Sequence, residues 1–272
     1  MKRIVTMQDL SCMGKCSLTV ALPVLSAMGL ECAVLPTAVL STHTGFPGPA
    51  VVDLEDFASR AIAHWAGLEP RFDGISVGYL ANPGQVALAQ ELIRSFAGEN
   101  TFVCIDPAMA DHGRLYSGLT PEHPGAMREL CRLGDLILPN LTEGALLTGM
   151  EYRADADPGY YREMVDELLN LGCGGVMLTG FHPLRGRIGL LGKRRSGEFF
   201  SCSATEVPRS CHGTGDLFAA VVTGGILRGM EWEAAGDLAC GIVRRAILAT
   251  PPDSRYGVAF EGCIPELVEK IK

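Results

Sequence analysis

Hydrophobic and polar positions follow two different periods along the chain. Short apolar runs rich in β-branched residues predict strands, and amphipathic stretches of helical length separate them. The predicted strands lie at residues 3–7, 32–39, 72–80, 101–106, 135–140 and 174–180, and the helices between them at residues 16–29, 54–66, 83–97, 122–133 and 160–172. Alternation of this kind predicts a mostly parallel central sheet with helices on both faces.

The last part of the chain departs from this alternation. Residues 187–192 and 198–207 are strand-like and are joined by the short turn KRRSG, which predicts a β-hairpin at one edge of the sheet. Two further helices are expected at about 215–229 and 232–248. Because no internal repeat and no long Pro/Gly/Ser linker divides the sequence, we expect residues 1–272 to form a single α/β domain.

The amino-acid composition limits the kinds of molecule that the protein is expected to bind. The 272 residues carry a formal net charge of −8, and the one basic cluster, GKRRSGE, is more typical of a solvated turn than of a nucleic-acid-binding face. The longest apolar runs fall short of the roughly 20 residues that a membrane span needs, and the N-terminus has no signal-peptide pattern. The ten cysteines are dispersed, with no Cys-x-x-Cys pair. We therefore expect a cytoplasmic protein with reduced thiols and with neither a nucleic-acid nor a membrane partner.

A Gly-Thr-Gly-Asp sequence at residues 213–216 precedes an apolar stretch that predicts a helix. A glycine turn at a helix N-terminus points several free N–H groups in one direction, and the helix dipole makes the place favourable for an anion such as phosphate. Asp216 would compete with that anion unless it has a task of its own. The simpler alternative is that Asp216 only caps the helix or interacts with its dipole.

Carboxylate and amide side chains follow two of the predicted strands, at the end where open parallel sheets bind ligands. Asp106 and Asp111 come after the fourth strand, and Asn140 and Glu143 after the fifth. Such groups suit Mg²⁺, which binds through few carboxylates together with water and substrate phosphates. Alternatively, Asp111 caps a turn and Glu143 is an acid at a helix N-terminus. With the glycine turn, the set predicts phosphoryl transfer from a Mg-nucleotide to a hydroxyl group.

Several motifs in a fixed order carry a resemblance to one family. The segments MQDLSCMGKCSLTVALP, STHTG, GYLANPGQ, IDPAMADHGRLY, PNLTE, VMLTG and GTGDLFAA resemble, over nearly the whole length, the pyridoxal/pyridoxine/pyridoxamine kinases of the ribokinase-like superfamily. GTGD alone indicates the superfamily, and STHTG near residue 43 points to the vitamin kinases. The resemblance implies a three-layer ribokinase-like fold and an ATP-dependent kinase, active in vitamin B6 salvage, that phosphorylates the 5′-hydroxymethyl group of a B6 vitamer.

The same resemblance implies roles for individual residues. Asp216 would be the general base, and the backbone amides of Gly213, Thr214 and Gly215 would stabilise charge on the transferred phosphoryl group. The residues expected around ATP are Asp106, Asn140, Glu143, Thr179, Gly213 and Gly215, and those expected to organise Mg²⁺ are Asp106, Asp111 and Glu143. The residues expected to contact the vitamer are Asp9, His43, Thr44, Tyr79 and Asp216, and residues 109–118 would form a lid.

Two other functions stay open at this point. The hydroxymethylpyrimidine kinases share the fold and the Gly-Thr-Gly turn, and their substrate is also a heteroaromatic methanol, so the mechanism would be unchanged. A non-catalytic vitamin-binding or nucleotide-binding protein is the second alternative, against which the presence of Asp216 argues. Asp9 stands where well-known pyridoxal kinases carry serine. Relatives are commonly dimers, so a homodimer is expected.

Overall fold

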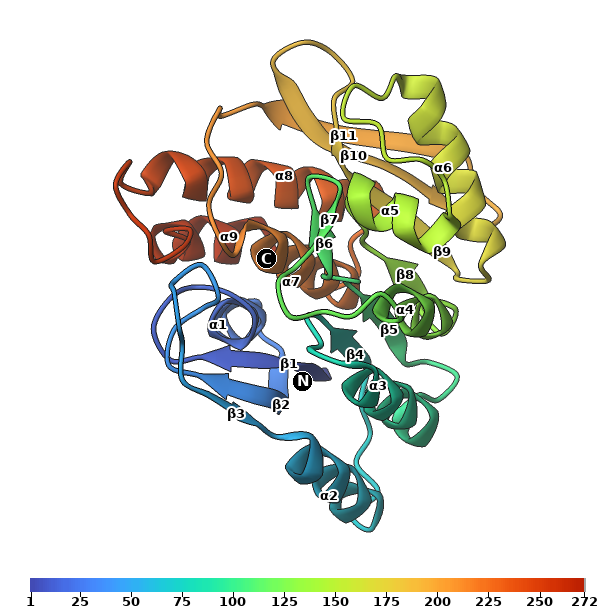
Figure 1. The fold of residues 1–272 in the computed structure, drawn as a ribbon, viewed down its shortest axis with the longest axis vertical. Helices are drawn as coiled ribbons and strands as arrows, with labels where there is room; N and C mark the ends of the chain where they lie inside the picture. The colour runs from blue at the N-terminus through green and yellow to red at the C-terminus, as the bar shows by residue number, and fades with distance from the viewer. Residues whose placement is uncertain (272) are drawn as a thin grey trace.

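A nine-stranded sheet forms the centre of the computed structural model, which describes residues 1–271 (Figure 1). The strands are β1 (Arg3–Ser11), β2 (Glu31–Leu40), β3 (Val51–Asp53), β4 (Gly74–Val77), β5 (Phe102–Ile105), β8 (Leu136–Ile137), β9 (Gly175–Phe181), β10 (Arg187–Arg194) and β11 (Phe199–Thr205). Their order across the sheet is β11-β10-β9-β8-β5-β4-β1-β2-β3. The six strands from β9 to β2 are parallel, whereas β3 and the β10–β11 hairpin are antiparallel at the two edges. The predicted parallel sheet and edge hairpin are confirmed.

Two layers of helices cover the sheet (Figure 1). The helices are α1 (Leu18–Ala27), α2 (Glu55–Ala66), α3 (Pro83–Phe96), α4 (His123–Cys131), α5 (Leu141–Thr148), α6 (Pro158–Asn170), α7 (Thr214–Leu227), α8 (Trp232–Ala249) and α9 (Ile264–Lys270), with the 3₁₀ turn η1 (Glu261–Cys263). Helices α1, α7, α8 and α9 pack on one face, and α2 to α6 pack on the other. None of the helices within residues 1–271 is long and apolar enough to cross a membrane.

The central strands are buried on both faces, which explains their continuous apolar runs. In β5, Val103 and Ile105 pack in the core under α2 to α6, and Cys104 between them packs in the opposite core. Because successive side chains of a strand point to opposite faces, each central strand contributes to both cores. The polar residues at the ends of these strands are therefore the ones available for binding and catalysis.

Five parts of the fold differ from the sequence-based expectation. Strand β1 continues to Ser11, so Asp9 lies within a strand that pairs with β2 and not beyond its end. A helix start near Glu143 was one alternative from the sequence, but the extent of helix α5 was not predicted, because six of its eight residues are buried and it has no polar face to reveal a helical period. The three-residue strand β3, the hairpin of β6 (Ala110–Asp111) and β7 (Arg114–Leu115), and α9 are short elements without a strong periodic signal.

Candidate active site

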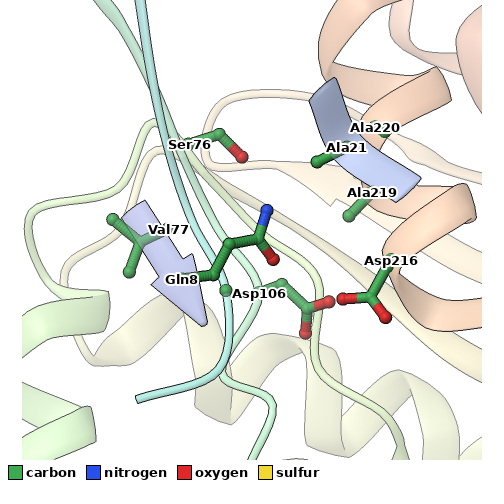
Figure 2. Close-up of a pocket in the computed structure, with 9 residues that line it drawn as sticks. Gln8, Ala21, Ser76, Val77, Asp106, Asp216, Ala219 and Ala220 are labelled. Carbon is green, nitrogen blue, oxygen red and sulfur yellow. The ribbon is translucent and has the colours of Figure 1, made fainter. Parts of the chain in front are cut away.

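The strand ends and the first turn of α7 meet in a small cavity. Its lining includes Gln8 of β1, Ser76 of β4, Asp106 after β5, and Asp216 and Ala219 of α7. Figure 2 shows the carboxylates of Asp106 and Asp216 pointing toward one another across this cavity. The cavity measures about 10 Å³, room for about one water molecule, so a substrate would bind along the strand ends outside it. Two predicted site residues that are 110 positions apart in the sequence are thus brought together.

The turn before α7 requires a glycine at position 213. Gly213 has φ 81° and ψ 3°, the left-handed region, and a Cβ at this position would overlap the carbonyl oxygen of Lys15. The Thr214 hydroxyl donates to the carbonyl oxygen of Cys211 at 3.1 Å, so the side chain of Thr214 braces the turn. A Cβ at Gly215 would lie 4.0 Å from Oδ2 of Asp106. The first-turn N–H groups of α7 therefore lie beside both carboxylates, where a phosphate could accept from them.

Burial changes the proton affinity of both acids in the cavity. Desolvation raises the pKa of Asp216 to about 6, an effect opposed by a hydrogen bond from the backbone N–H of Ser17 and reinforced by the negative charge of Asp9. Desolvation, followed by the charges of Glu143 and Asp216, holds the pKa of Asp106 well above its usual range. A carboxylate with a pKa near 6 can be deprotonated at neutral pH and still accept a proton readily.

Glu143 occupies the first turn of α5, where backbone N–H groups satisfy both of its oxygens. Oε2 accepts from the N–H of Asn140 at 2.8 Å, and Oε1 accepts from Met109 at 3.0 Å and from Ala110 at 3.4 Å. The side chain of Asn140 accepts from the N–H of Glu143 at 3.0 Å, which completes a capping box. Burial raises the pKa of Glu143 to about 8, although these hydrogen bonds act to lower it. In this structure Glu143 is an acid at a helix N-terminus, one of the two alternatives from the sequence.

The predicted lid, residues 109–118, contains the β6–β7 hairpin. Asn140 Nδ2 donates to the Ala110 carbonyl oxygen at 2.8 Å, and the hydroxyl of Thr142 accepts from the N–H of Gly113 at 3.0 Å. Helix α5 and its cap thus bind both the start of the hairpin, at Ala110, and its turn, at Gly113. Asp111 is exposed and its Oδ1 accepts from the N–H of His112 at 2.7 Å.

The donors near the cavity fit Mg²⁺ in type. They are carboxylate oxygens, which are hard ligands, and Asp106 faces Asp216 with Glu143 close enough to raise its pKa. Within residues 1–271, however, no group of three His, Cys, Asp or Glu side chains could hold a metal by itself. Asp106, Asp111 and Glu143 are therefore not brought together as a ligand cluster, and an ion would depend on water and substrate phosphates for most of its ligands.

Thr179 lies near the carboxyl end of β9, beside the first turn of α5. Its backbone N–H donates to the carbonyl oxygen of Pro139 at 2.9 Å, and it forms an isolated parallel bridge with Asn140. The structure thus places Thr179 and Asn140, two residues expected around ATP, next to one another. The strand order puts them beside β5 and Asp106.

The residues expected to contact the vitamer lie on the β1 side of the cavity. Asp9 is buried, and it accepts a hydrogen bond from the Ser11 hydroxyl at 3.3 Å. Burial raises the pKa of Asp9, and burial together with the Asp9 charge raises the pKa of Tyr79. The ring of Tyr79 lies 6.5 Å from that of Tyr116, which follows the hairpin. Tyr116 was not singled out from the sequence.

The side chain of His43 links two loops through hydrogen bonds. Its Nε2 lies 2.9 Å from the carbonyl oxygen of Arg255, and its Nδ1 accepts from the N–H of Gly45 at 3.1 Å. Since a carbonyl only accepts, the ring is neutral with the proton on Nε2, and burial lowers its pKa accordingly. Both ring nitrogens are occupied within the protein, while Thr44 beside it is exposed.

Gln8 and Ser17 were missed by the sequence-based reasoning. Both are 4% exposed: Gln8 directly follows the first predicted strand, and Ser17 falls in the first turn of the helix predicted at 16–29. A buried glutamine within a strand is a usable signal, because Gln8 follows Thr6 at the strand period of two and its amide donates to the Thr6 hydroxyl at 2.9 Å. Ser17 carries no comparable signal, since a serine before a helix is an ordinary cap.

A carboxylate beside a glycine turn at a helix N-terminus, on a sheet of this topology, is typical of phosphoryl-transfer enzymes of the ribokinase-like fold. The model of the family described as phosphomethylpyrimidine kinase matches residues 22–257. The chain therefore belongs to the phosphomethylpyrimidine kinase family, and the expectations of the fold and of a kinase are confirmed.

Solved structures and a curated relative agree with this membership. A Bacteroides thetaiotaomicron protein named as a candidate phosphomethylpyrimidine kinase, in a crystal form with pyridoxal, is 34% identical, with TM-score 0.93 and coverage of 98% of this chain and 95% of that one. Pyridoxal kinase from Lactobacillus plantarum is 31% identical, with TM-score 0.91 and coverage of 99% and 97%. A candidate pyridoxal kinase of Schizosaccharomyces pombe is 30% identical over 161 residues, 55% of this chain and 49% of that protein.

Proposed function

We propose that this enzyme transfers the terminal phosphoryl group of ATP to the 5′-hydroxymethyl group of pyridoxal, pyridoxine or pyridoxamine. The observation that carries the proposal is the Asp216 carboxylate, which faces Asp106 beside the glycine turn and has a pKa raised to about 6. The likeness to a pyridoxal kinase at 31% identity, and to a structure with pyridoxal at 34%, supports the choice of a B6 vitamer.

Asp216 acts as the general base in this proposal. It accepts the proton of the 5′-hydroxyl as that oxygen forms a bond to the γ-phosphorus, while the bond from the γ-phosphorus to the β,γ-bridging oxygen breaks and ADP leaves. The N–H groups of Gly213, Thr214 and Gly215 donate to the transferred group as its charge develops. Their fixed directions follow from the left-handed conformation of Gly213.

Mg²⁺ bound with ATP would neutralise phosphate charge at this site. Asp106 supplies the carboxylate that faces Asp216 across the cavity, and Asn140 and Thr179 line the ATP side. Glu143 contributes by fixing the backbone of Met109 and Ala110, next to Asp106 in the chain. Asp111, on the hairpin, is the further carboxylate proposed to organise the ion through water.

The vitamer ring is proposed to lie between Asp9 and the loop after β2. Asp9, Thr44 and Tyr79 contact the ring, and His43 holds the loop that carries Thr44. The β6–β7 hairpin with Tyr116 covers the site and excludes water during transfer. We further propose that the enzyme is cytoplasmic and forms a homodimer, whose mass light scattering would measure.

Phosphorylation of hydroxymethylpyrimidine is the second candidate, because the family is described as phosphomethylpyrimidine kinase and a Rhizobium meliloti relative, 26% identical, is named hydroxymethylpyrimidine/phosphomethylpyrimidine kinase. A coupled ADP-release assay at fixed Mg-ATP separates the candidates when pyridoxal, pyridoxine, pyridoxamine and hydroxymethylpyrimidine are compared. We expect kcat/KM to be higher for at least one B6 vitamer than for hydroxymethylpyrimidine. The variant Asp9→Ala should shrink that ratio and leave the KM for ATP unchanged. A wild-type preference for hydroxymethylpyrimidine would contradict the proposed acceptor.

A further inference from the structure

The segment Arg255–Val258, which follows α8, lies against the two turns that precede α1 and α7. The backbone N–H of Lys15, in the turn before α1, donates to the carbonyl oxygen of Tyr256 at 2.7 Å. The N–H of Val258 donates to the carbonyl oxygen of His212 at 2.9 Å, directly before the glycine turn. One short segment from the end of the chain is therefore hydrogen-bonded to both turns.

The backbones of these three stretches lie too close together for a side chain between them. Gly257 has φ 96°, and a Cβ there would lie 2.6 Å from the carbonyl oxygen of Lys15 and 3.1 Å from that of His212. A Cβ at Gly213 would overlap the same oxygen of Lys15. Gly257 and Lys15 also form an isolated parallel bridge. Because the Lys15 carbonyl is enclosed between two glycines, a displacement of the segment would displace the glycine turn as well.

The same segment also holds the loop of residues 41–48, which follows β2 and is called the acceptor loop below. The Nε2–H of the buried His43 donates to the carbonyl oxygen of Arg255 at 2.9 Å. The guanidinium group of Arg255 lies over the ring of Phe46, 5.1 Å from its centroid, and the ring of Tyr256 lies 5.5 Å from that of Phe46. Backbone and side chains of the segment thus both contact the acceptor loop.

We propose that Arg255–Val258 is a positioning segment, which sets the place of the acceptor loop relative to the glycine turn. Phosphoryl transfer requires the acceptor hydroxyl to lie close to the γ-phosphorus, and a misplacement of about 1 Å can lower the rate by about 10²-fold. The segment acts through the loops that it holds, and none of its own side chains needs to contact a substrate. This proposal rests on the proposed function, in which the acceptor loop binds the vitamer and the glycine turn binds the transferred group.

The link to the glycine turn is tested with Gly257→Ala. The added Cβ would lie 2.6 Å from the Lys15 carbonyl oxygen, so the segment must shift, and kcat should fall about tenfold. Gly229→Ala is the matched control, because Gly229 has φ 92° after α7 and no atom within 4 Å of an added Cβ. It carries the same backbone cost and should keep the wild-type kcat. Equal kcat values in the two variants would overturn the link to the glycine turn.

The link to the acceptor loop is tested at His43, which keeps the proposal testable even if Gly257→Ala does not fold. The amide of His43→Gln can place an N–H donor near the position of Nε2, whereas the shorter side chain of His43→Asn cannot reach it. The KM for pyridoxal should rise about tenfold in His43→Asn, which leaves the Arg255 carbonyl without its donor, and clearly less in His43→Gln. The KM for Mg-ATP should not change in either variant. Equal increases in the KM for pyridoxal would overturn the role of this hydrogen bond.

The double variant Gly257→Ala/His43→Asn tests whether one segment carries both effects. Once Gly257→Ala has shifted the segment, the loss of the bond at His43 should matter less, so the two losses should not multiply. We expect the loss of kcat/KM in the double variant to be at least about threefold smaller than the product of the single losses. A loss equal to that product would mean two independent contacts and would overturn the positioning segment.

The kinetics of the wild type separate this inference from the proposed function. If the wild type phosphorylates hydroxymethylpyrimidine and no B6 vitamer, the proposed acceptor is wrong, and the same variants are compared on hydroxymethylpyrimidine. A smaller than multiplicative loss in the double variant would then still support the positioning segment. If the wild type is active on pyridoxal and Gly257→Ala matches Gly229→Ala, the inference fails while the proposed function stands.

Discussion

The first turns of α5 and α7 carry an acid at the same position, and the two acids face different partners. Glu143 and Asp216 are each the third residue of their helix, at the same edge of the sheet. The cap of α5 is Asn140, and Glu143 reaches back to the N–H of this cap, as in other capping boxes. The cap of α7 is Gly213, which has no side chain, and Asp216 faces the cavity instead.

This comparison shows that the position of an acid in a helix does not decide its role. Burial raises the pKa of both side chains, to about 8 for Glu143 and about 6 for Asp216. The difference lies in the hydrogen bonds, since backbone N–H groups occupy both oxygens of Glu143, whereas Asp216 presents its carboxylate beside open N–H groups. We therefore assign proton transfer to Asp216 and the positioning of the backbone of Met109 and Ala110 to Glu143.

The largest effect is expected for Asp216→Asn. Asparagine has nearly the shape of aspartate but cannot accept the proton of the hydroxyl group, so kcat should fall by about 10²–10⁴-fold. ATP binding, measured by calorimetry, should be retained. A kcat near that of the wild type would remove Asp216 from the role of base.

A substitution in the glycine turn should have the next largest effect. Gly213→Ala would place a Cβ on the carbonyl oxygen of Lys15, so the turn must shift, and kcat should fall by about 10–10²-fold. Gly149→Ala is the matched control, because Gly149 has φ 80° after α5 and no atom within 4 Å of an added Cβ. It should cost about 1–2 kcal/mol of stability and leave kcat unchanged. Equal kcat losses in the two variants would show that the turn has no special role.

The variant Glu143→Gln tests the role of the acid in the first turn of α5. If Glu143 helps to organise Mg²⁺ by holding Met109 and Ala110 near Asp106, the variant should need a several-fold higher Mg²⁺ concentration for its half-maximal rate. The KM for the vitamer should change little. An Mg²⁺ titration that coincides with that of the wild type would leave Glu143 as a capping acid alone.

The smallest effect is expected for Asn140→Ala, which breaks the capping box of α5. Loss of a side-chain cap costs about 1 kcal/mol, so the thermal midpoint should fall by about 2–4 °C for a chain of this size. Differential scanning calorimetry measures this shift. A drop much larger than this would mean that the bond from Asn140 Nδ2 to the Ala110 carbonyl oxygen also stabilises the hairpin.

The sequence predicts the layers of the fold because the central strands are buried on both faces and most helices are amphipathic. It also indicates Asp216 and Asp106, since a glycine turn and a strand end are local features. The sequence does not show which hydrogen bonds Glu143 accepts, because two of the donors, the N–H groups of Met109 and Ala110, lie more than thirty residues away along the chain. The conformation of Ser17 cannot be predicted from the sequence either, because its φ of 49° follows from contacts of the preceding turn and not from its own residue type.

The pH dependence of kcat/KM for pyridoxal tests the central claim most directly. Asp216 must be deprotonated to accept a proton, so activity should be full above its pKa of about 6 and should fall about tenfold per pH unit below it. The profile is measured from pH 4.5 to 8 in the wild type and in Glu143→Gln at saturating Mg²⁺. We expect an acid limb near pH 6 in both enzymes. An acid limb that is absent from the wild type, or that disappears in Glu143→Gln, would contradict the assignment of Asp216 as the base.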